Sequence, residues 1–243
     1  MRSVLDFLRI TISFSINEVI LTLSEDAMID KDVVIELIRE AFDGNVYPGD
    51  AFLQGSLEGC ELYEEVGFFR GKVDWRTLDA EMLDSHYSAL SSFSEAGFRF
   101  FLPAYLIADL QDELRTADPL FHLTGGFYVL SAEIPTQSRV FIRKIGGSVL
   151  LNPKRYGAMT FNDYMRFRLS VFTKEEAKAI VAYLNYMRDR DIHGINRDQI
   201  DIALDSYWLD RAENAPSEES LERHLREEEE FLADIDGSTS DNS

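Results

Sequence analysis

The stretch Ser94-Glu95-Ala96-Gly97-Phe98-Arg99-Phe100-Phe101-Leu102-Pro103-Ala104-Tyr105-Leu106-Ile107-Ala108-Asp109-Leu110 decides the fold of this 243-residue chain. Ser94 is a residue type that caps helices well. The apolar residues after it cover nearly every side of a helix, and such a helix is normally buried. We therefore expect this segment to be the centre of the core. Pro103 lies inside it and predicts a kink or a split at Leu102.

Helical spacing recurs on both sides of this segment. Asp30 is a plausible cap for the first helix, whose expected apolar stripe is Val33, Val34, Leu37, Ile38, Ala41 and Phe42. The sequence Thr173-Lys174-Glu175-Glu176 is a capping box, in which the threonine and the second glutamate satisfy each other's main-chain N–H groups. Helices are predicted at residues 31–43, 61–69, 79–91, 161–169 (capped by Thr160) and 198–211, and after the capping box.

Residues 123–159 change character and predict a small β element. Short β-prone runs lie at 127–130, 139–145 and 148–151, and Gly146-Gly147 predicts a tight hairpin between the last two. The fold class is therefore mainly α: a compact multi-helix domain with a small antiparallel β element and an acidic C-terminal helix or tail. We expect a helical domain at 28–212, with a β-hairpin insertion near 127–151.

The two ends of the chain differ from this domain. Residues 1–27 form a strand-like N-terminal extension, because Ile10, Ile12, Phe14 and Ile16 alternate with polar residues, and Met28 is an alternative start. Residues 213–243 form an acidic tail with 11 acidic and 2 basic residues. Pro216 and Ser217 begin its predicted helix, whose apolar stripe of Leu221, Leu225 and Leu232 is too thin to be stable alone.

The formal net charge is −20, and this argues against direct binding to nucleic acid or to an anionic membrane. No stretch has the unbroken apolar run that a membrane span or a secretory signal needs. The chain has one cysteine, Cys60, so no intramolecular disulfide can form, which favours a reducing compartment. These observations predict a cytoplasmic protein.

The usual catalytic and metal-binding motifs are missing from the sequence. It has no phosphate-binding glycine loop, no His-Glu-x-x-His and no Cys-x-x-Cys, so we assign no catalytic residue, no metal ligand and no cofactor. Several polar and aromatic residues near predicted loops or helix ends could still line a ligand pocket. This candidate pocket consists of Tyr47, Asp50, Trp75, His86, Asp118 and His122. Each also has a plain structural explanation, such as a core histidine, a buried anchor or a loop hydrogen bond.

A cluster of basic residues stands out in this acidic chain. Residues 139–168 hold seven bases and one acid, Asp163. The candidate docking patch within them is Arg139, Arg143, Lys144, Lys154 and Arg155. One interpretation is a solvated basic face that balances the acidic remainder. The other is a docking site for an anionic protein partner or for the acidic tail, in which residues 217–236 fold back onto the basic hairpin.

Several short segments resemble an uncharacterised bacterial family, a domain of unknown function. They are Phe69-Arg70-Gly71-Lys72 with Trp75, Phe101-Leu102-Pro103-Ala104-Tyr105-Leu106, and Asp118-Pro119-Leu120-Phe121-His122-Leu123-Thr124, with further likeness at 172–177, 183–184 and 207–209. The resemblance covers roughly residues 31–213 and implies a bacterial, compact, mostly helical protein without an assigned activity. The basic hairpin region departs from the family's pattern, which leaves its role open.

Three functions remain open on this basis. The first is a non-catalytic interaction or regulatory protein, favoured by the missing motifs, the acidic tail and the basic patch. The second is an enzyme or small-ligand binder that uses the six pocket residues. The third, with least support, is a nucleic-acid mimic, which would need carboxylates spaced like phosphates across one face.

Overall fold

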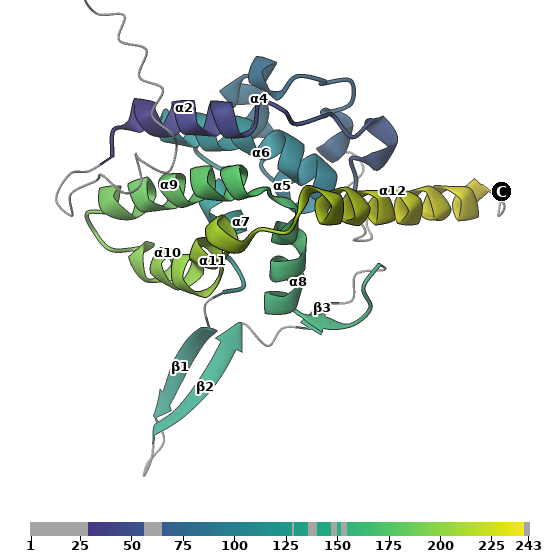
Figure 1. The fold of residues 1–243 in the computed structure, drawn as a ribbon. Helices are drawn as coiled ribbons and strands as arrows, with labels where there is room; N and C mark the ends of the chain where they lie inside the picture. Colours follow the sequence, from purple (N-terminus) through teal and green to yellow (C-terminus); the bar gives the residue numbers. More distant parts are fainter. Residues whose placement is uncertain are drawn as a thin grey trace, which may run out of the picture.

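The computed structural model describes residues 29–55, 65–127, 129–135, 140–146, 150–151 and 155–240, with the backbone alone at 129–151 and 235–240. The fold is mainly α, as predicted, and helices pack around a buried central helix, α6 (Figure 1). The longer helices are α2 (Lys31–Ala41), α6 (Glu95–Leu110), α8 (Phe161–Arg168), α9 (Lys174–Arg190) and α12 (Glu218–Ser240). The shorter ones are α4 (Ala80–Ser85), α5 (Ala89–Ser92), α7 (Pro119–Thr124), α10 (Arg197–Ala203) and α11 (Leu209–Asn214).

Helix α6 is the core helix that the sequence predicts. The Ser94 hydroxyl caps it by accepting a hydrogen bond from the Gly97 N–H at 2.9 Å. Both sides of the helix are buried, with Phe98, Phe101 and Leu102 fully enclosed. The predicted split at Leu102 is wrong, because α6 is a single helix that runs through Pro103.

Helix α9 packs against α2 and α11, and α2 also contacts α6. The predicted capping box of α9 is confirmed, with Thr173 and Glu176 each accepting from the other's main-chain N–H. The Glu176 carboxylate also accepts from the Arg99 guanidinium on α6 at 2.9 Å, and it is 1% exposed. One glutamate therefore both caps α9 and joins it to the core helix.

Three of the helix predictions need correction. In α2, Val33 is exposed, while Ile35, which was left out of the stripe, is buried. The helix predicted at 79–91 is two helices, α4 and α5, because His86 leaves helical geometry and its carbonyl accepts from the Tyr105 hydroxyl at 3.3 Å. The helix predicted at 198–211 contains a π turn, Leu204–Trp208, between α10 and α11.

The β element is antiparallel, but its pairing differs from the prediction. Strand β1 (Val129–Pro135) pairs with β2 (Val140–Gly146), from Val129 opposite Gly146 to Pro135 opposite Val140. The short strand β3 (Leu150–Leu151) pairs with β4 (Met159–Thr160). Gly146-Gly147 therefore does not join a hairpin: β2 finds a partner of its own length in β1, which offers more ladder hydrogen bonds. The β1–β2 ribbon projects away from the helices (Figure 1).

Some predictions fall outside the described residues. They concern the strand-like extension at 1–27, the alternative start at Met28, Cys60, and residues 61–64 of the helix expected at 61–69. The division of the chain into an extension, a domain and a tail stays a prediction. Among the helices that the structure describes, none combines the length and the apolar character needed to cross a membrane.

Candidate functional site

The N-terminus of α6 holds a carboxylate that comes from the acidic tail. Glu228 of α12 accepts hydrogen bonds from the main-chain N–H groups of Glu95, at 2.7 Å, and Ala96, at 2.9 Å. The first N–H groups of a helix have no partner within the helix, and the helix dipole makes this end favourable for an anion. The tail carboxylate therefore satisfies two donors that the core helix leaves open.

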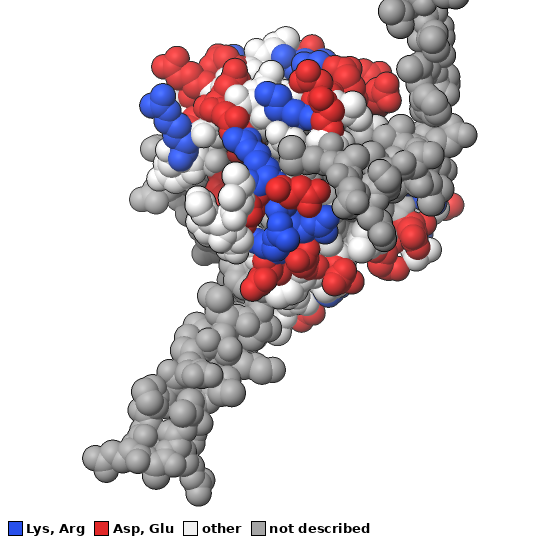
Figure 2. All heavy atoms as spheres, turned by 90° about the vertical axis from the view of Figure 1, so that its left-hand side faces the viewer, with Lys and Arg blue, Asp and Glu red and all other residues white. Residues whose placement is uncertain are grey.

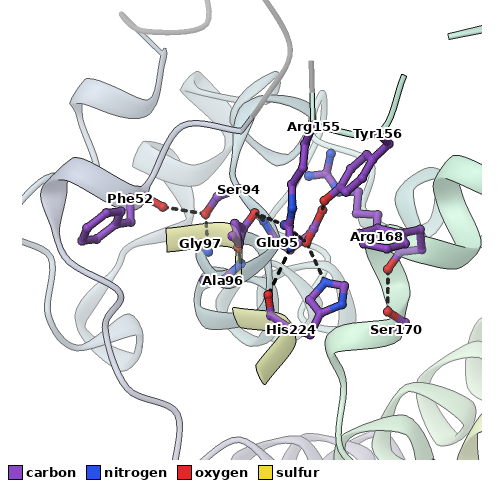
Figure 3. A network of polar contacts seen from close by, with 12 residues as sticks. Phe52, Ser94, Glu95, Ala96, Gly97, Arg155, Tyr156, Arg168, Ser170 and His224 are labelled. Atoms are coloured by element: carbon purple, nitrogen blue, oxygen red, sulfur yellow. Dashed lines mark hydrogen bonds and ion pairs between the residues drawn. The ribbon is translucent and has the colours of Figure 1, made fainter. Parts of the chain in front are cut away.

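The side chain of Glu95 gathers three further groups around the same point (Figure 3). Its carboxylate accepts from Arg155 Nη1 at 2.9 Å and lies 2.7 Å from His224 Nε2. The Tyr156 hydroxyl donates to its other oxygen. We call Glu95, Arg155, Tyr156, His224 and Glu228 the anchor cluster.

The anchor cluster joins three parts of the chain that are distant in sequence. Glu95 begins α6, Arg155 and Tyr156 lie in the turn between β3 and β4, and His224 and Glu228 lie one helical turn apart on α12. Arg155 also donates to the main-chain carbonyl of His224 at 3.2 Å, so it holds α12 by its backbone as well. The Tyr156 and His224 rings both pack on Phe167, with ring centroids 4.1 and 4.7 Å away.

Burial and like charge dominate the electrostatics of the cluster. Burial raises the pKa of Glu228 to about 8, and the neighbouring Glu95 carboxylate adds to the rise. The two main-chain N–H groups and Arg155, whose Nη1 is 3.9 Å from Glu228, act in the opposite direction. Burial also raises the pKa of the Tyr156 hydroxyl, followed by the charge of Glu95. Tyr156 therefore acts as a hydrogen-bond donor.

The cavity that the described residues form beside the cluster is too small for a substrate. The cavity lined by Glu95, Glu228, Tyr164 and Arg168 has a volume of about 10 Å³. That is room for about one water molecule, whereas ligand pockets measure hundreds of cubic ångströms. The arrangement can hold α12 on the core and can exchange protons with a single water. It does not admit a small-molecule reactant.

Tyr47 and Asp50, two of the six predicted pocket residues, are brought into direct contact. The Tyr47 hydroxyl donates to Asp50, and the carboxylate of Asp50 accepts from the Gly71 N–H at 2.8 Å. The Tyr47 hydrogen bond, followed by that of Gly71, lowers the pKa of Asp50. These contacts fix the 65–71 segment to the loop after α2. The His86 ring lies edge-on to the Phe69 ring, with centroids 6.3 Å apart, and it stacks on Phe68 at 3.9 Å.

The other three pocket residues lie in different surroundings. Trp75 is buried, with the Arg76 guanidinium 4.5 Å from its ring centre, beside a cavity of about 190 Å³ that none of the other five lines. Asp118 caps α7 by accepting from the Phe121 N–H at 2.9 Å. His122 packs beside Phe98, and burial, followed by the charge of Arg168, lowers its pKa to about 3. A shared pocket for the six residues stays a prediction.

The candidate basic patch can be followed at one of its five positions. Arg155 is in the anchor cluster, while the side chains of Arg139, Arg143, Lys144 and Lys154 lie outside the described residues. Arg168, in the same basic stretch, is buried and donates to the carbonyls of Ser91 and Phe93 at 3.3 Å. At these two positions the positive charge is paired or hydrogen-bonded with groups of the protein itself.

The acidic members of the cluster were missed from the sequence, although one signal was available. Leu225 and Leu232 were assigned to the apolar stripe of the tail helix. Glu228 lies three residues after the first and four before the second, so it occupies the same side of the helix. A glutamate within an apolar stripe indicates a buried carboxylate with a partner. Glu95 gave no such signal, because acidic residues are common in the first turn of helices.

Surface charge is mixed on the face drawn in Figure 2, where acidic and basic side chains lie among one another. This face does not present the uniform array of carboxylates that a nucleic-acid mimic needs. Within the described part of the chain, no group of three or more histidine, cysteine, aspartate or glutamate side chains is placed to hold a metal ion.

The fold and the anchor cluster define a class: a mainly helical domain with an acidic C-terminal helix fixed to the start of its core helix. The model of the family of unknown function DUF6714 matches residues 30–212, and the chain belongs to this family. The resemblance seen in the sequence is therefore confirmed. No curated protein and no solved structure matches the chain. The matched range contains Glu95, Arg155 and Tyr156 and ends before α12 begins.

Proposed function

We propose that this protein is a non-catalytic interaction and regulatory protein of the bacterial cytoplasm, in which α12 controls access to the helical domain. One observation carries the proposal. A carboxylate from a helix outside the family's matched range occupies the N-terminus of the core helix inside that range. Arg155 supports the tail-docking part of the proposal, because it contacts the tail helix at His224. The single cysteine and the net charge of −20 support the cytoplasmic location.

Few of the described side chains of α12 are buried against the domain. Among its described side chains, Leu221, Glu228 and Leu232 are buried and Leu225 packs against the core, and its packing partners include α6 and the turn Leu169–Val171. The exposed residues Pro216 and Ser217 connect it to the domain. A helix held by few buried contacts opens at a lower free energy than the core does. We infer that α12 detaches without unfolding of the domain.

The outer face of α12 is acidic and remains available while the helix is docked. Its described exposed acids are Glu218, Glu219, Glu222, Glu227, Glu229, Glu230 and Asp234, against two exposed bases, Arg223 and Arg226. The helix extends past the body of the domain (Figure 1). A partner that binds only the docked or only the released state shifts the equilibrium between them, and this is the physical basis of the proposed regulation.

A matched pair of charge reversals tests the proposal. Glu228→Lys places a cation at the positive end of α6, whereas Glu229→Lys makes the same change of charge at an exposed neighbour. Each full-length variant is used to capture proteins from native-host lysate at low and high salt. We expect one stoichiometric protein whose recovery differs between the two variants. Equal recovery with both variants, or none with either, would contradict regulation by α12.

The enzyme alternative has less support from the described residues. The anchor cluster has titratable groups but a cavity of about 10 Å³, and the six predicted pocket residues divide among several environments. The proposed interaction function therefore rests on the docking of α12, and an assay for turnover would be the next step only after a negative capture experiment.

A further inference from the structure

The surface beneath α12 accepts a particular type of side chain at each of four positions of the helix. At position 228 it takes a carboxylate, because two main-chain N–H groups and a guanidinium face that point. At position 224 it takes a ring that carries a polar nitrogen, because the ring packs on Phe167 and its nitrogen meets the Glu95 carboxylate. At positions 221 and 232 it buries leucine side chains.

We propose that this surface is a receptor for an acidic amphipathic helix, and that a partner presents such a helix in place of α12. The inference rests on the proposed function and names the partner's chemistry. The required pattern is an apolar residue followed seven positions later by glutamate, with a further apolar residue four positions after it. Charge complementarity favours an acidic helix over a basic one, since a cation at the glutamate position would meet the positive end of α6 and Arg155.

Two observations indicate that the site exchanges its occupant. A groove of about 500 Å³, whose lining includes Ala41, Thr173 and Leu221, runs beside the first turn of α12, so that turn does not fill the space between itself and the domain. The buried carboxylate also lies close to a second one, Glu95, which offsets part of the gain from its hydrogen bonds. A competing helix with the same pattern makes the same contacts. Exchange therefore costs little free energy apart from the advantage that covalent attachment to the domain gives α12.

The covalent link between α12 and the domain determines how a competing helix must be tested. A helix joined by a short linker has an effective local concentration on the order of millimolar. A free helix at micromolar concentration therefore competes poorly with an intact α12. The full-length Glu228→Lys variant removes this competition, because its own helix no longer matches the site. The Glu229→Lys chain is the matched control with an intact α12.

The probe is a labelled peptide of residues 213–236, with the native sequence or with lysine in place of Glu228 or Glu229. We expect the native peptide to bind the Glu228→Lys chain at least about tenfold more tightly than the Glu229→Lys chain. On the Glu228→Lys chain, the Glu228→Lys peptide should bind at least about tenfold more weakly than the native peptide, since two hydrogen bonds from the start of α6 are lost and a cation meets Arg155. The peptide with lysine at 229 should stay within about threefold of the native one.

A second measurement covers the case in which the Glu228→Lys chain does not fold. A protease site between Ala215 and Ser217 of the otherwise native chain is cut after folding, and excess unlabelled native peptide should then displace the cut helix. Equal binding of the native and Glu228→Lys peptides, or no displacement by native peptide, would overturn the inference. Capture of a stoichiometric partner that lacks an acidic helix would keep the proposed function and also overturn it. Migration of the parent chain as a dimer that the Glu228→Lys change abolishes and the Glu229→Lys change preserves would make a second copy of this chain the source of the helix and would support the receptor chemistry.

Discussion

The side-chain amide of Asn45 donates a hydrogen bond to the main-chain carbonyl of Arg99 at 3.2 Å. In a regular α-helix that carbonyl accepts from the N–H of the residue four positions later, which here is Pro103. Proline has no N–H, so the carbonyl would otherwise remain unpaired inside the core. A side chain from the loop after α2 therefore supplies the donor that the central helix lacks, and α6 continues through its proline.

Replacement of this donor should destabilise the domain. We expect Asn45→Ala to lower the free energy of unfolding by about 1–2 kcal/mol, because a half-buried carbonyl loses its partner. In a Pro103→Ala background the residue at 103 can donate to Arg99, so the same Asn45→Ala change should cost clearly less. Urea unfolding of the four proteins measures this coupling. Equal costs in both backgrounds would show that Asn45 acts through some other contact.

Glu176 should matter far more than its neighbour Glu175. Glu176 is 1% exposed, caps α9 and pairs with Arg99, whereas Glu175 is exposed on the same helical turn. We expect Glu176→Ala to lower the free energy of unfolding by about 3 kcal/mol, because the half-buried Arg99 guanidinium and the start of α9 lose their partner. Glu175→Ala should change it by less than about 0.5 kcal/mol. Similar costs for the two variants in chemical denaturation would refute the role of Glu176.

Docking of α12 should weaken as the pH rises from about 4.5 to 8. The ordinary pKa of a glutamate is near 4.5, and burial, with Glu95 nearby, raises that of Glu228 to about 8 in the docked state. Below both values the carboxyl is protonated in either state, and the contribution to docking is complete. Between them the released helix loses its proton while the docked one keeps it, so release becomes easier with rising pH.

The anisotropy of a dye at position 230 reports this release, with Glu230→Cys introduced in a Cys60→Ser chain. We expect the anisotropy to fall with rising pH in the parent chain and to vary less in a Glu228→Gln chain. Glu227→Gln, an exposed neighbour on the same helix, is the control and should behave like the parent. A Glu228→Gln profile that overlays the parent profile would show that Glu228 does not cause the pH response.

His122 should contribute to acid destabilisation. Burial, followed by Arg168, lowers its pKa from 6.5 to about 3, so the folded protein keeps the ring neutral. The unfolded chain takes up a proton below pH 6.5, and the stability present above that pH is lost as the pH falls toward 3. Since part of the side chain remains accessible, we expect only a fraction of the full effect.

The comparison is between His122→Gln and His193→Gln, the second at an exposed position. The free energy of unfolding should fall less steeply between pH 7 and 4.5 in the His122→Gln protein than in the parent. His193→Gln should leave the slope unchanged. A parent slope that survives the change at His122 would show that its ring is protonated in the folded state.

Local signals predicted the elements that depend on neighbouring residues. Ser94, Thr160 and Thr173 each begin a helix by bonding a main-chain N–H within three residues, and such contacts are visible in a sequence. Strand pairing was harder to predict. The glycine pair at 146–147 is a valid hairpin signal, yet β2 pairs with the strand before it, because the longer ladder outweighs a favourable turn.

The sequence by itself determined a mainly helical family domain, its buried central helix, its caps and an acidic tail helix, because these follow from residue type and short-range spacing. Only the tertiary structure decided how Pro103 is tolerated and what the tail helix contacts. Asn45 is 54 residues from Arg99, and Glu228 is 133 residues from Glu95, whose N–H donates to it. Contacts at such separations depend on how the helices pack, and no local pattern specifies which donor meets which acceptor.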